Sequence, residues 1–201
     1  MSNKIYLYGA SGHAKVIIDI LKSQNKKLTG LVDDNEAIKE ILEYPVSQTL
    51  PKDASVIVSI GDNKIREKVV NQLSDNKFET AIHSSAIVSE YSSIEEGTVV
   101  MQGAIIQSSC KVGKQCIINT GASVDHDCQI GDFVHISPQA ILCGNVTVGE
   151  GTWIGAGSTI IEGVTIGKWC VIGAGSVVTK DIPDNRLAVG NRCKIIKEIN
   201  T

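Results

Sequence analysis

One histidine of this sequence stands between two carboxylates. The chain of 201 residues has four histidines, and His126 lies between Asp125 and Asp127 in the segment VDHDC, residues 124–128. A carboxylate beside an imidazole can orient the ring and stabilise its protonated form, which makes the ring a stronger base. The segment therefore makes His126 a candidate base for proton transfer, although a lone surface histidine usually has no such role.

A second group of residues suited to chemistry follows the first apolar segment. The turn GASGHAK, residues 9–15, carries glycines that let backbone N–H groups approach a phosphate at the start of a helix. Asp33 and Asp34 come about twenty residues after Gly12, where carboxylates can accept hydrogen bonds from a ribose or a base. The pattern G-x-x-G is shorter than the dinucleotide motif, so the spacing alone leaves a structural turn and a solvated acidic loop equally open.

Strands and helices must bring these residues together. The pattern of apolar segments predicts buried strands over residues 4–8, 28–32 and 54–60, the last running into Gly61. It also predicts an amphipathic helix from the first turn to about Ser23 and a second helix over about residues 64–73. Strand, glycine turn, helix and strand form the start of a nucleotide-binding unit, with the ligand expected at the carboxyl ends of the strands.

From residue 82 to residue 183 the sequence repeats every six residues without insertion or deletion. The first residue of each hexad is aliphatic: Ile82, Val88, Ile94, Val100, Ile106, Val112, Ile118, Val124, Ile130, Ile136, Leu142, Val148, Ile154, Ile160, Ile166, Ile172 and Val178. A period of six fits neither an α-helix nor a sheet with crossover helices. The repeat predicts a parallel β-helix with three short faces in each coil of about eighteen residues.

The register predicts where each side chain lies around the coil. The first and fifth residues of a hexad point inward, whereas His126, a third residue, points outward. The motif IGAGS occurs at residues 154–158 and 172–176, one coil apart, so two Gly-Ala-Gly corners should stack and expose backbone groups. An extended ligand with amides could lie along that edge, and glycines also simply allow tight corners.

Composition narrows the class of protein. Four of the six cysteines fall in the small fifth position and are predicted as core residues: Cys110, Cys116, Cys128 and Cys170. A net charge of −3 argues against nucleic acid as a partner, and no apolar run approaches the length of a membrane span or signal peptide. These features predict a cytoplasmic protein with reduced cysteines. The expected parts are residues 1–81, 82–183 and a C-terminal cap, 184–201.

The hexads resemble the left-handed β-helix of the hexapeptide-repeat acyltransferases over about half of the chain, and the left hand is implied by that resemblance alone. The whole arrangement of glycine turn, Asp33-Asp34, Gly61 and hexads resembles, over essentially the full length, one branch of sugar acetyltransferases. These are the bacterial amino-sugar N-acetyltransferases and sialic-acid O-acetyltransferases. Ala14 stands where many members of that family have glycine.

The resemblance implies an α/β Rossmann-like N-terminal domain followed by a left-handed parallel β-helix. It also implies acetyl-CoA as co-substrate, no metal, and a homotrimer with active sites between subunits. His126 becomes the catalytic base and Asp127 its support. For the nucleotide-linked sugar, with UDP the expected nucleotide, the family motif assigns Ser11, Gly12, His13, Asp33, Asp34 and Gly61. For acetyl-CoA, the family motif and the stacked corners assign His135, Gly155, Ala156, Gly173 and Ala174.

Several alternatives remain open from the sequence. The same base could acetylate a hydroxyl of a sialic acid instead of an amine of a nucleotide-linked sugar, and the sequence does not identify the sugar. A zinc hydratase of the carbonic anhydrase type would need three histidine ligands, and only His126 and His135 occupy plausible outward positions in the repeat. A non-catalytic scaffold would give no role to the segment 125–127 or to the nucleotide-like domain.

Overall fold

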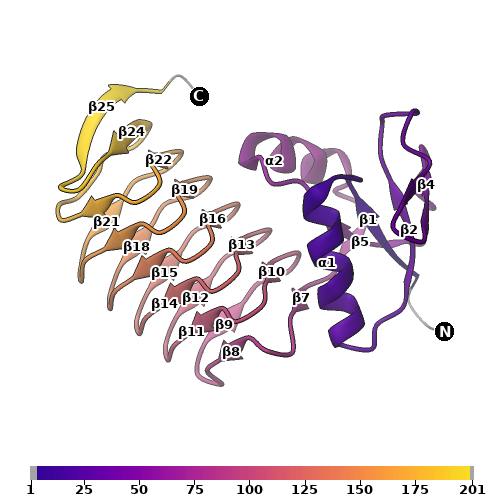
Figure 1. Cartoon of the computed structure of the whole chain (residues 1–201), viewed down its shortest axis with the longest axis horizontal. Helices are drawn as coiled ribbons and strands as arrows, with labels where there is room; N and C mark the ends of the chain where they lie inside the picture. Colours follow the sequence, from indigo (N-terminus) through magenta and orange to yellow (C-terminus); the bar gives the residue numbers. More distant parts are fainter. Residues whose placement is uncertain (1–3, 200–201) are drawn as a thin grey trace.

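A mostly parallel sheet with two flanking helices forms the N-terminal part of the computed structural model, which describes residues 4–199 (Figure 1). The ends of the first and last expected parts, residues 1–3 and 200–201, lie outside the described residues. The strand order is β3-β4-β2-β1-β5-β6, and β3 and β4 form the only antiparallel pair within it among the residues described. Its elements are β1 Ile5–Tyr8, α1 Gly12–Ser23, β2 Leu28–Val32, β3 Glu40–Ile41, β4 Tyr44–Ser47, β5 Ser55–Val58, α2 Asn63–Gln72 and β6 Lys77–Phe78.

The predicted strands and helices of this part agree with β1, α1, β2, β5 and α2 to within a few residues. Helix α1 forms because its apolar residues recur at helical spacing and bury one face: Ala14, Ile17, Ile18, Ile20 and Leu21. It ends at Ser23, and two residues later Asn25 has a φ of 55°, in the left-handed region that asparagine tolerates. The short strands β3, β4 and β6 are not predicted by the sequence, because strands of two to four residues carry too little alternation to be recognised, and β4 contains Pro45.

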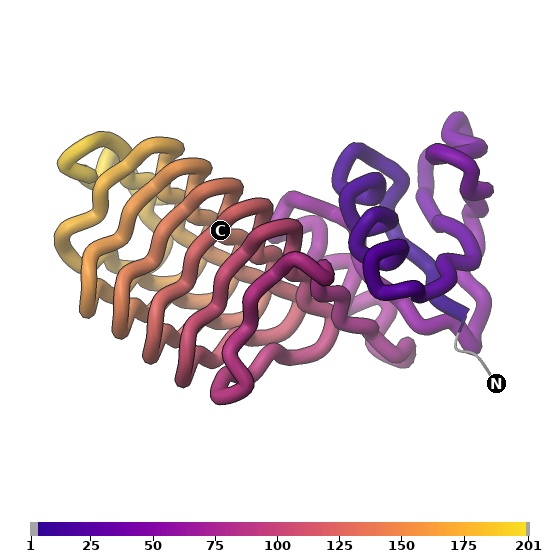
Figure 2. The backbone as a smooth tube through the Cα atoms, turned by 60° about the horizontal axis from the view of Figure 1, so that its bottom comes forward, coloured from indigo at the N-terminus to yellow at the C-terminus, as the bar shows by residue number. Residues whose placement is uncertain are grey.

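The hexads form a parallel β-helix whose coils stack in an even row (Figure 2). Face 1 contains β7 Ala81–Ile82, β10 Val99–Val100, β13 Ile117–Ile118, β16 His135–Ile136, β19 Trp153–Ile154 and β22 Val171–Ile172. Face 2 contains β8 Ile87–Val88, β11 Ile105–Ile106, β14 Ser123–Val124, β17 Ile141–Leu142, β20 Thr159–Ile160 and β23 Val177–Val178. Face 3 contains β9 Ser93–Ile94, β12 Lys111–Val112, β15 Gln129–Ile130, β18 Thr147–Val148 and β21 Thr165–Ile166.

The interior of the coil is filled as the register predicts. Every first hexad residue from Val100 to Val178 is buried, and the four cysteines of the fifth position are buried in the same core with free thiols. Only the first coil is less covered, with Ile82, Val88 and Ile94 partly buried at its open end. Each buried aliphatic side chain contributes roughly 1.5–3 kcal/mol relative to exposure, so the repeated core stabilises the whole stack.

A hairpin closes the far end of the coil. Strand β24, Arg186–Val189, pairs in parallel with β22, and β25, Lys194–Glu198, pairs antiparallel with β24. The expected C-terminal cap therefore extends face 1 by two strands. The boundaries at residues 81/82 and 183/184 stay predictions.

The N-terminal domain packs on face 1 of the coil. Outward residues of that face, Ala81, Val99 and Ile117, belong to one buried cluster with the apolar side of α1. The two parts therefore share a continuous core, and face 1 is the side of the triangle that the N-terminal domain covers (Figure 1).

A fully buried arginine joins α2 to the coil. Arg66 donates hydrogen bonds from Nε to the Gln115 carbonyl and from Nη2 to the Phe133 carbonyl, each at 2.8 Å. The same guanidinium also donates to the Ile60 carbonyl at 2.9 Å and to Oδ1 of Asn63 at 2.8 Å. Burial lowers the pKa of Arg66 to about 10, so the side chain remains charged at neutral pH. One cation thus holds the end of β5, α2 and two successive coils together.

We predict that Arg66→Met lowers the free energy of unfolding by about 3 kcal/mol, because two carbonyls on the coil lose charged donors and stay buried. Urea denaturation measures this change. Arg192→Met is the matched control, since Arg192 is exposed on the C-terminal hairpin and the same charge is removed. Equal stability of the two variants would contradict the role given to Arg66.

Candidate functional site

A cavity of about 230 Å³ lies at the carboxyl ends of β1, β2 and β5. Its walls include four of the predicted nucleotide-sugar residues: Ser11, Asp33, Asp34 and Gly61. Gly12 and His13 follow directly in α1 but do not line the cavity itself. The cavity also contains Tyr8 and Ile60, which sequence reasoning missed although they directly follow or end the predicted strands. This is the edge at which open α/β sheets bind ligands.

The two aspartates of this cavity have different hydrogen-bond partners and different structural roles. Asp33 accepts hydrogen bonds from the Ala10 amide at 2.6 Å and the Asn35 amide at 2.9 Å, so it fixes the glycine turn. Asp34 is exposed and accepts a hydrogen bond from the Tyr8 hydroxyl at 2.9 Å. Burial, followed by that bond, raises the pKa of Tyr8 to about 12. Asp34 therefore presents the freer carboxylate to a ligand.

The glycine turn leaves the start of α1 open to an anion. Gly9 has a φ of 108°, a conformation that other residues rarely adopt. Ser11 stands at the N-cap of α1, but its side chain makes no capping hydrogen bond among the described residues. The first N–H groups of the helix and the positive end of its dipole thus face the cavity edge.

His13 and His135 lie together under the N-terminal domain. His135 points outward from face 1, as its register predicts, but the domain covers it and leaves 7% of the residue exposed. Its Nε2 lies 3.0 Å from Nδ2 of Asn119, and its ring stacks on Trp153 with centroids 5.4 Å apart. Burial, and then Arg66, lowers the pKa of His13 to about 4 and of His135 to about 3. Both imidazoles are therefore neutral at physiological pH.

His126 occupies the corner between faces 2 and 3, which we call corner 2–3. Its Nδ1 lies 2.8 Å from Oδ2 of Asp127, and 56% of its side chain is exposed. Asp127 adopts a φ of 62°, the left-handed conformation that aspartate tolerates at the turn. The hydrogen bond to Asp127, followed by the charge of Asp125, raises the pKa of His126. The predicted pairing of base and carboxylate is thus present in the structure.

The two Gly-Ala-Gly segments stack at the corner between faces 1 and 2, which we call corner 1–2. The Gly155 amide donates to the Ile172 carbonyl at 2.8 Å, and the Gly175 amide donates to the Ala156 carbonyl at 2.8 Å. A Cβ on Gly155 would lie 2.5 Å from the Ala174 nitrogen, so glycine permits the close approach of the two coils. Ala156 and Ala174 are exposed, which leaves a narrow edge lined by backbone.

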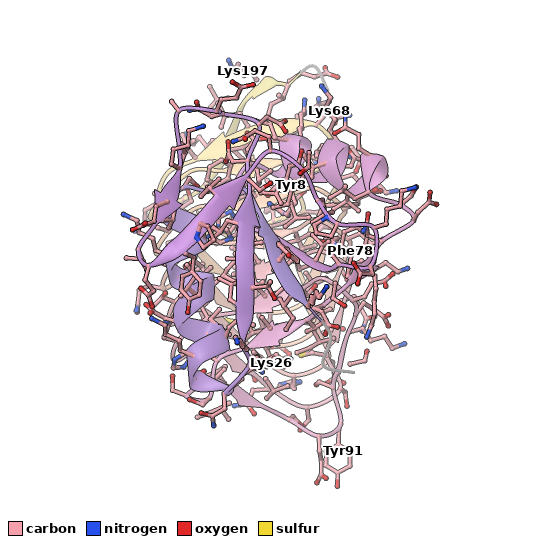
Figure 3. All side chains as sticks on the ribbon, turned by 90° about the vertical axis from the view of Figure 1, so that its right-hand side faces the viewer. Tyr8, Lys26, Lys68, Phe78, Tyr91 and Lys197 are labelled. Carbon is pink, nitrogen blue, oxygen red and sulfur yellow. The ribbon has the colours of Figure 1, made fainter. Side chains whose placement is uncertain are left out.

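The base and the nucleotide cavity lie on opposite sides of the chain. Corner 2–3 is the vertex of the triangle that faces away from face 1, where the N-terminal domain packs. Figure 3 shows Tyr91, which shares the corner column of Asp127, at the far end of the molecule from Tyr8 at the cavity. One chain therefore does not bring its own His126 to its own cavity.

Neither a metal centre nor a membrane-spanning helix emerges from residues 4–199. Within that range, no three or more histidine, cysteine, aspartate or glutamate side chains gather so as to hold a metal ion. No helix in the same range is long and apolar enough to cross a membrane.

Comparison with known proteins identifies both parts of the chain. Residues 4–73 match the PglD N-terminal domain, and residues 145–180 match the bacterial transferase hexapeptide family of six repeats. A mutant of perosamine N-acetyltransferase from Caulobacter crescentus, solved with CoA and GDP-perosamine, is 37% identical with a TM-score of 0.93. That alignment covers 98% of this chain and 99% of the other.

Two further relatives agree. The acetyltransferase domain of PglB from Neisseria gonorrhoeae FA1090, in complex with acetyl coenzyme A, is 32% identical with a TM-score of 0.91 over 98% of this chain and 100% of that one. UDP-N-acetylbacillosamine N-acetyltransferase from Bacillus subtilis (strain 168) is 40% identical over 105 residues, 46% of this chain. The match spans 49% of that curated relative's length.

The chain belongs to the hexapeptide-repeat sugar acetyltransferases that carry a PglD N-terminal domain. The predicted fold, a Rossmann-like domain followed by a left-handed parallel β-helix, is confirmed. The predicted enzyme class, an acetyltransferase, is confirmed as well.

Sequence reasoning missed residues that contact the predicted site residues from distant parts of the sequence. Arg66 contacts the coil only because the N-terminal domain folds onto face 1, whereas Asn119 lies on the coil itself, one turn before His135. A lone arginine in the second predicted helix gave no signal, since most such residues are solvated. Trp153 could have been found, because it lies one coil after His135 in the same outward column.

The lowered pKa values of His13 and His135 predict a dependence of stability on pH. Their pKa values in the folded protein lie below the usual 6.5, so the unfolded chain binds more protons as the pH falls through 6.5. We expect the free energy of unfolding to fall between pH 7 and pH 5, each histidine contributing at most about 1.4 kcal/mol per pH unit. Urea denaturation at several pH values measures the slope.

His135→Gln should remove about half of that slope, because one of two equivalent terms in the linkage disappears. His83→Gln is the control, since His83 lies at an outer corner of the first coil with its ring bonded to Ser85. An unchanged slope in His135→Gln would show that His135 is not buried in its neutral form.

Proposed function

We propose that this protein transfers the acetyl group of acetyl-CoA to the amine of a nucleotide-linked amino sugar. The observation that carries the proposal is the pairing of an exposed His126 with Asp127 on a coil whose far side supports a nucleotide-binding cavity. Relatives named above as perosamine and UDP-N-acetylbacillosamine N-acetyltransferases support the substrate class. Acetyl-CoA as the acetyl donor is supported by the CoA complexes of solved relatives.

The N-terminal cavity would hold the nucleotide. Its phosphates would meet the open N–H groups at Ser11 and Gly12, where the helix dipole favours anions. Asp34, already held by Tyr8, would accept hydrogen bonds from the N–H groups of a nucleobase. Gly61 lies on the opposite wall, while Asp33 keeps the turn in shape. We expect a UDP-linked sugar on the basis of the resemblance.

His126 would act as the general base. When Nδ1 donates a hydrogen bond to Asp127, Nε2 is free to act as acceptor. It would take a proton from the sugar amine as the amine nitrogen attacks the thioester carbonyl. Backbone N–H groups beside the thioester would stabilise the oxyanion of the tetrahedral intermediate. Collapse of that intermediate expels the CoA thiolate, which takes up the proton from the imidazolium.

The stacked edge at corner 1–2 would hold the pantetheine arm. Gly155, Ala156, Gly173 and Ala174 present backbone N–H and C=O groups without bulky side chains along two coils. The neutral imidazole of His135, bonded to Asn119 of the same corner, would stand near the thioester end. A neutral ring suits hydrogen bonding to an uncharged thioester and pantetheine better than a cation in a buried place.

The separation of base and cavity supports a site formed by two chains. Face 2 lies between corner 1–2 and corner 2–3, and its outward residues include the exposed Ile87 and Ile141. If face 2 of each copy turns toward a common threefold axis, corner 2–3 of one copy meets corner 1–2 of the next. His126 of one subunit then lies beside the CoA edge and the N-terminal domain of its neighbour. We propose a homotrimer on this geometry, and the free cysteines support our further proposal of a cytoplasmic location.

A purified-enzyme panel tests the proposed function. UDP- and GDP-linked amino sugars and free sialic acids are incubated with acetyl-CoA, and released thiol is measured. We predict turnover only with nucleotide-linked amines, and a loss of about 10² to 10⁴-fold in kcat for His126→Ala, the usual contribution of a general base. Acetylation of sialic acid alone, or undiminished turnover by His126→Ala, would overturn the proposal.

The same assay run against pH examines the partner of the base. Because the unprotonated imidazole is required, kcat/KM should fall as the pH drops below the raised pKa of His126. Asp127→Asn removes the main cause of that shift, so the acid limb should move to lower pH. An acid limb at the same pH in Asp127→Asn would show that Asp127 does not raise the basicity of His126.

Oligomeric state is predicted to depend on face 2. Ile141→Lys places a charge on that apolar face and should yield monomers in light scattering coupled to size exclusion, because burying an unpaired ammonium is unfavourable. Gln129→Lys is the matched control on the polar outward side of face 3 and should remain trimeric. A trimer in the Ile141→Lys variant would exclude face 2 as the contact surface.

A further inference from the structure

A glycine lies directly over the imidazole of His126. Gly144 comes eighteen residues after His126, so it occupies the same position of corner 2–3 one coil further along. The Asn145 amide donates to the His126 carbonyl at 2.8 Å and ties the two turns together. Gly144 is buried, although it stands at an outer corner of the coil.

The backbone does not require glycine at this position. The φ of Gly144 lies outside the left-handed region, unlike that of Gly163, which is 73°. Other coils carry residues with side chains at the same place in the corner: Glu90, Ser108, His126, Glu162 and Lys180. The reason for glycine at this one coil must therefore lie in what surrounds it.

The surroundings of Gly144 are the ring of His126. A Cβ on Gly144 would lie 2.6 Å from Cε1, 2.7 Å from Nε2 and 3.2 Å from Nδ1 of that imidazole, and these are the three nearest atoms. The contrast with Gly163 is clear, since a Cβ there would meet no atom of the described residues within 4 Å. The imidazole therefore fills the space that a side chain at residue 144 would take.

We propose that Gly144 is a positioning residue for the catalytic base, because its missing side chain gives the imidazole of His126 a fixed seat on the next coil. The inference rests on the proposed role of His126. In this seat the ring keeps Nδ1 on Asp127 while Nε2 lies at the edge of the corner. The seat restricts the ring without a further hydrogen bond, so the free nitrogen remains available for proton transfer.

A methyl group at residue 144 should displace the ring and spare the fold. More than half of the His126 side chain is exposed, so the imidazole can swing toward solvent. The backbone conformation at residue 144 suits alanine, and the interior of the coil is untouched. Loss of position without loss of stability is thus the signature that separates this role from a purely structural one.

The test is Gly144→Ala in the full-length enzyme. We expect kcat to fall about 100-fold, the effect of a misplacement of about 1 Å, with KM for both substrates and the melting temperature nearly unchanged. The acid limb of kcat/KM should move to lower pH, because the ring leaves Asp127. The charged groups that face the ring are Asp125, Asp127 and, across Gly144, Glu162. Chemical shifts of the His126 ring report its displacement without any assay of activity.

Two controls make the result specific. Gly163→Ala adds the same methyl group at the same corner one coil further along, in a strained conformation, so it should lower the melting temperature and leave kcat near the wild-type value. Gly144→Ala introduced into His126→Ala should cause no further loss of activity, because the ring it displaces is absent.

Wild-type kcat and an unmoved acid limb in Gly144→Ala would overturn the inference, as would an equal further loss in the His126→Ala background. These outcomes differ from failure of the proposed function, which would appear as full activity of His126→Ala itself. If His126→Ala is inactive while Gly144→Ala behaves as wild type, the proposed function stands and the positioning role falls.

Discussion

The backbone pairing of each residue with the residue eighteen positions later is the constraint on which the rest of the structure depends. Ser123 pairs with Ile141 on face 2, and His135 pairs with Trp153 on face 1. Because no insertion breaks the register from residue 82 to residue 183, every functional position is a column of the coil. The same pairing that stabilises the stack thus sets the base, the glycine edge and the histidine-tryptophan stack at fixed places around a triangle.

The second constraint is the attachment of the N-terminal domain to one face. Apolar side chains form a shared core between the domain and face 1. The buried Arg66 fixes the orientation of the domain on that face, because its guanidinium donates hydrogen bonds to carbonyls of two coils at once. This attachment covers His135 and turns an outward histidine into a buried neutral one. It also places the N-terminal cavity on the side of the coil that faces away from His126. This separation is the reason for proposing a composite site between subunits.

Much of this arrangement could be predicted from the sequence because a strict repeat converts residue number into direction. The buried cysteine column, the outward His126 and the stacked Gly-Ala-Gly corners needed only the period of six. Contacts between the parts could not be predicted in that way. The burial of His135 and the hydrogen bonds of Arg66 to the coil depend on how the N-terminal domain packs on face 1, which no local pattern encodes. The contact of His126 with Gly144 could be predicted in part. The register aligns the two residues, but only the structure shows that the imidazole fills the space beside the glycine.

The central claim is that the nucleotide cavity of one subunit works with His126 of another, and complementation between two inactive variants tests it most directly. His126→Ala removes the base, and Gly12→Glu places a negative charge at the open start of α1, where an added Cβ meets no atom of the described residues within 4 Å. Each variant alone should be inactive. Co-expressed in equal amounts, they should recover about a quarter of the wild-type rate, because about one interface in four then joins an intact cavity to an intact histidine. Activity no higher than that of the separate variants would show that base and cavity do not meet across subunits.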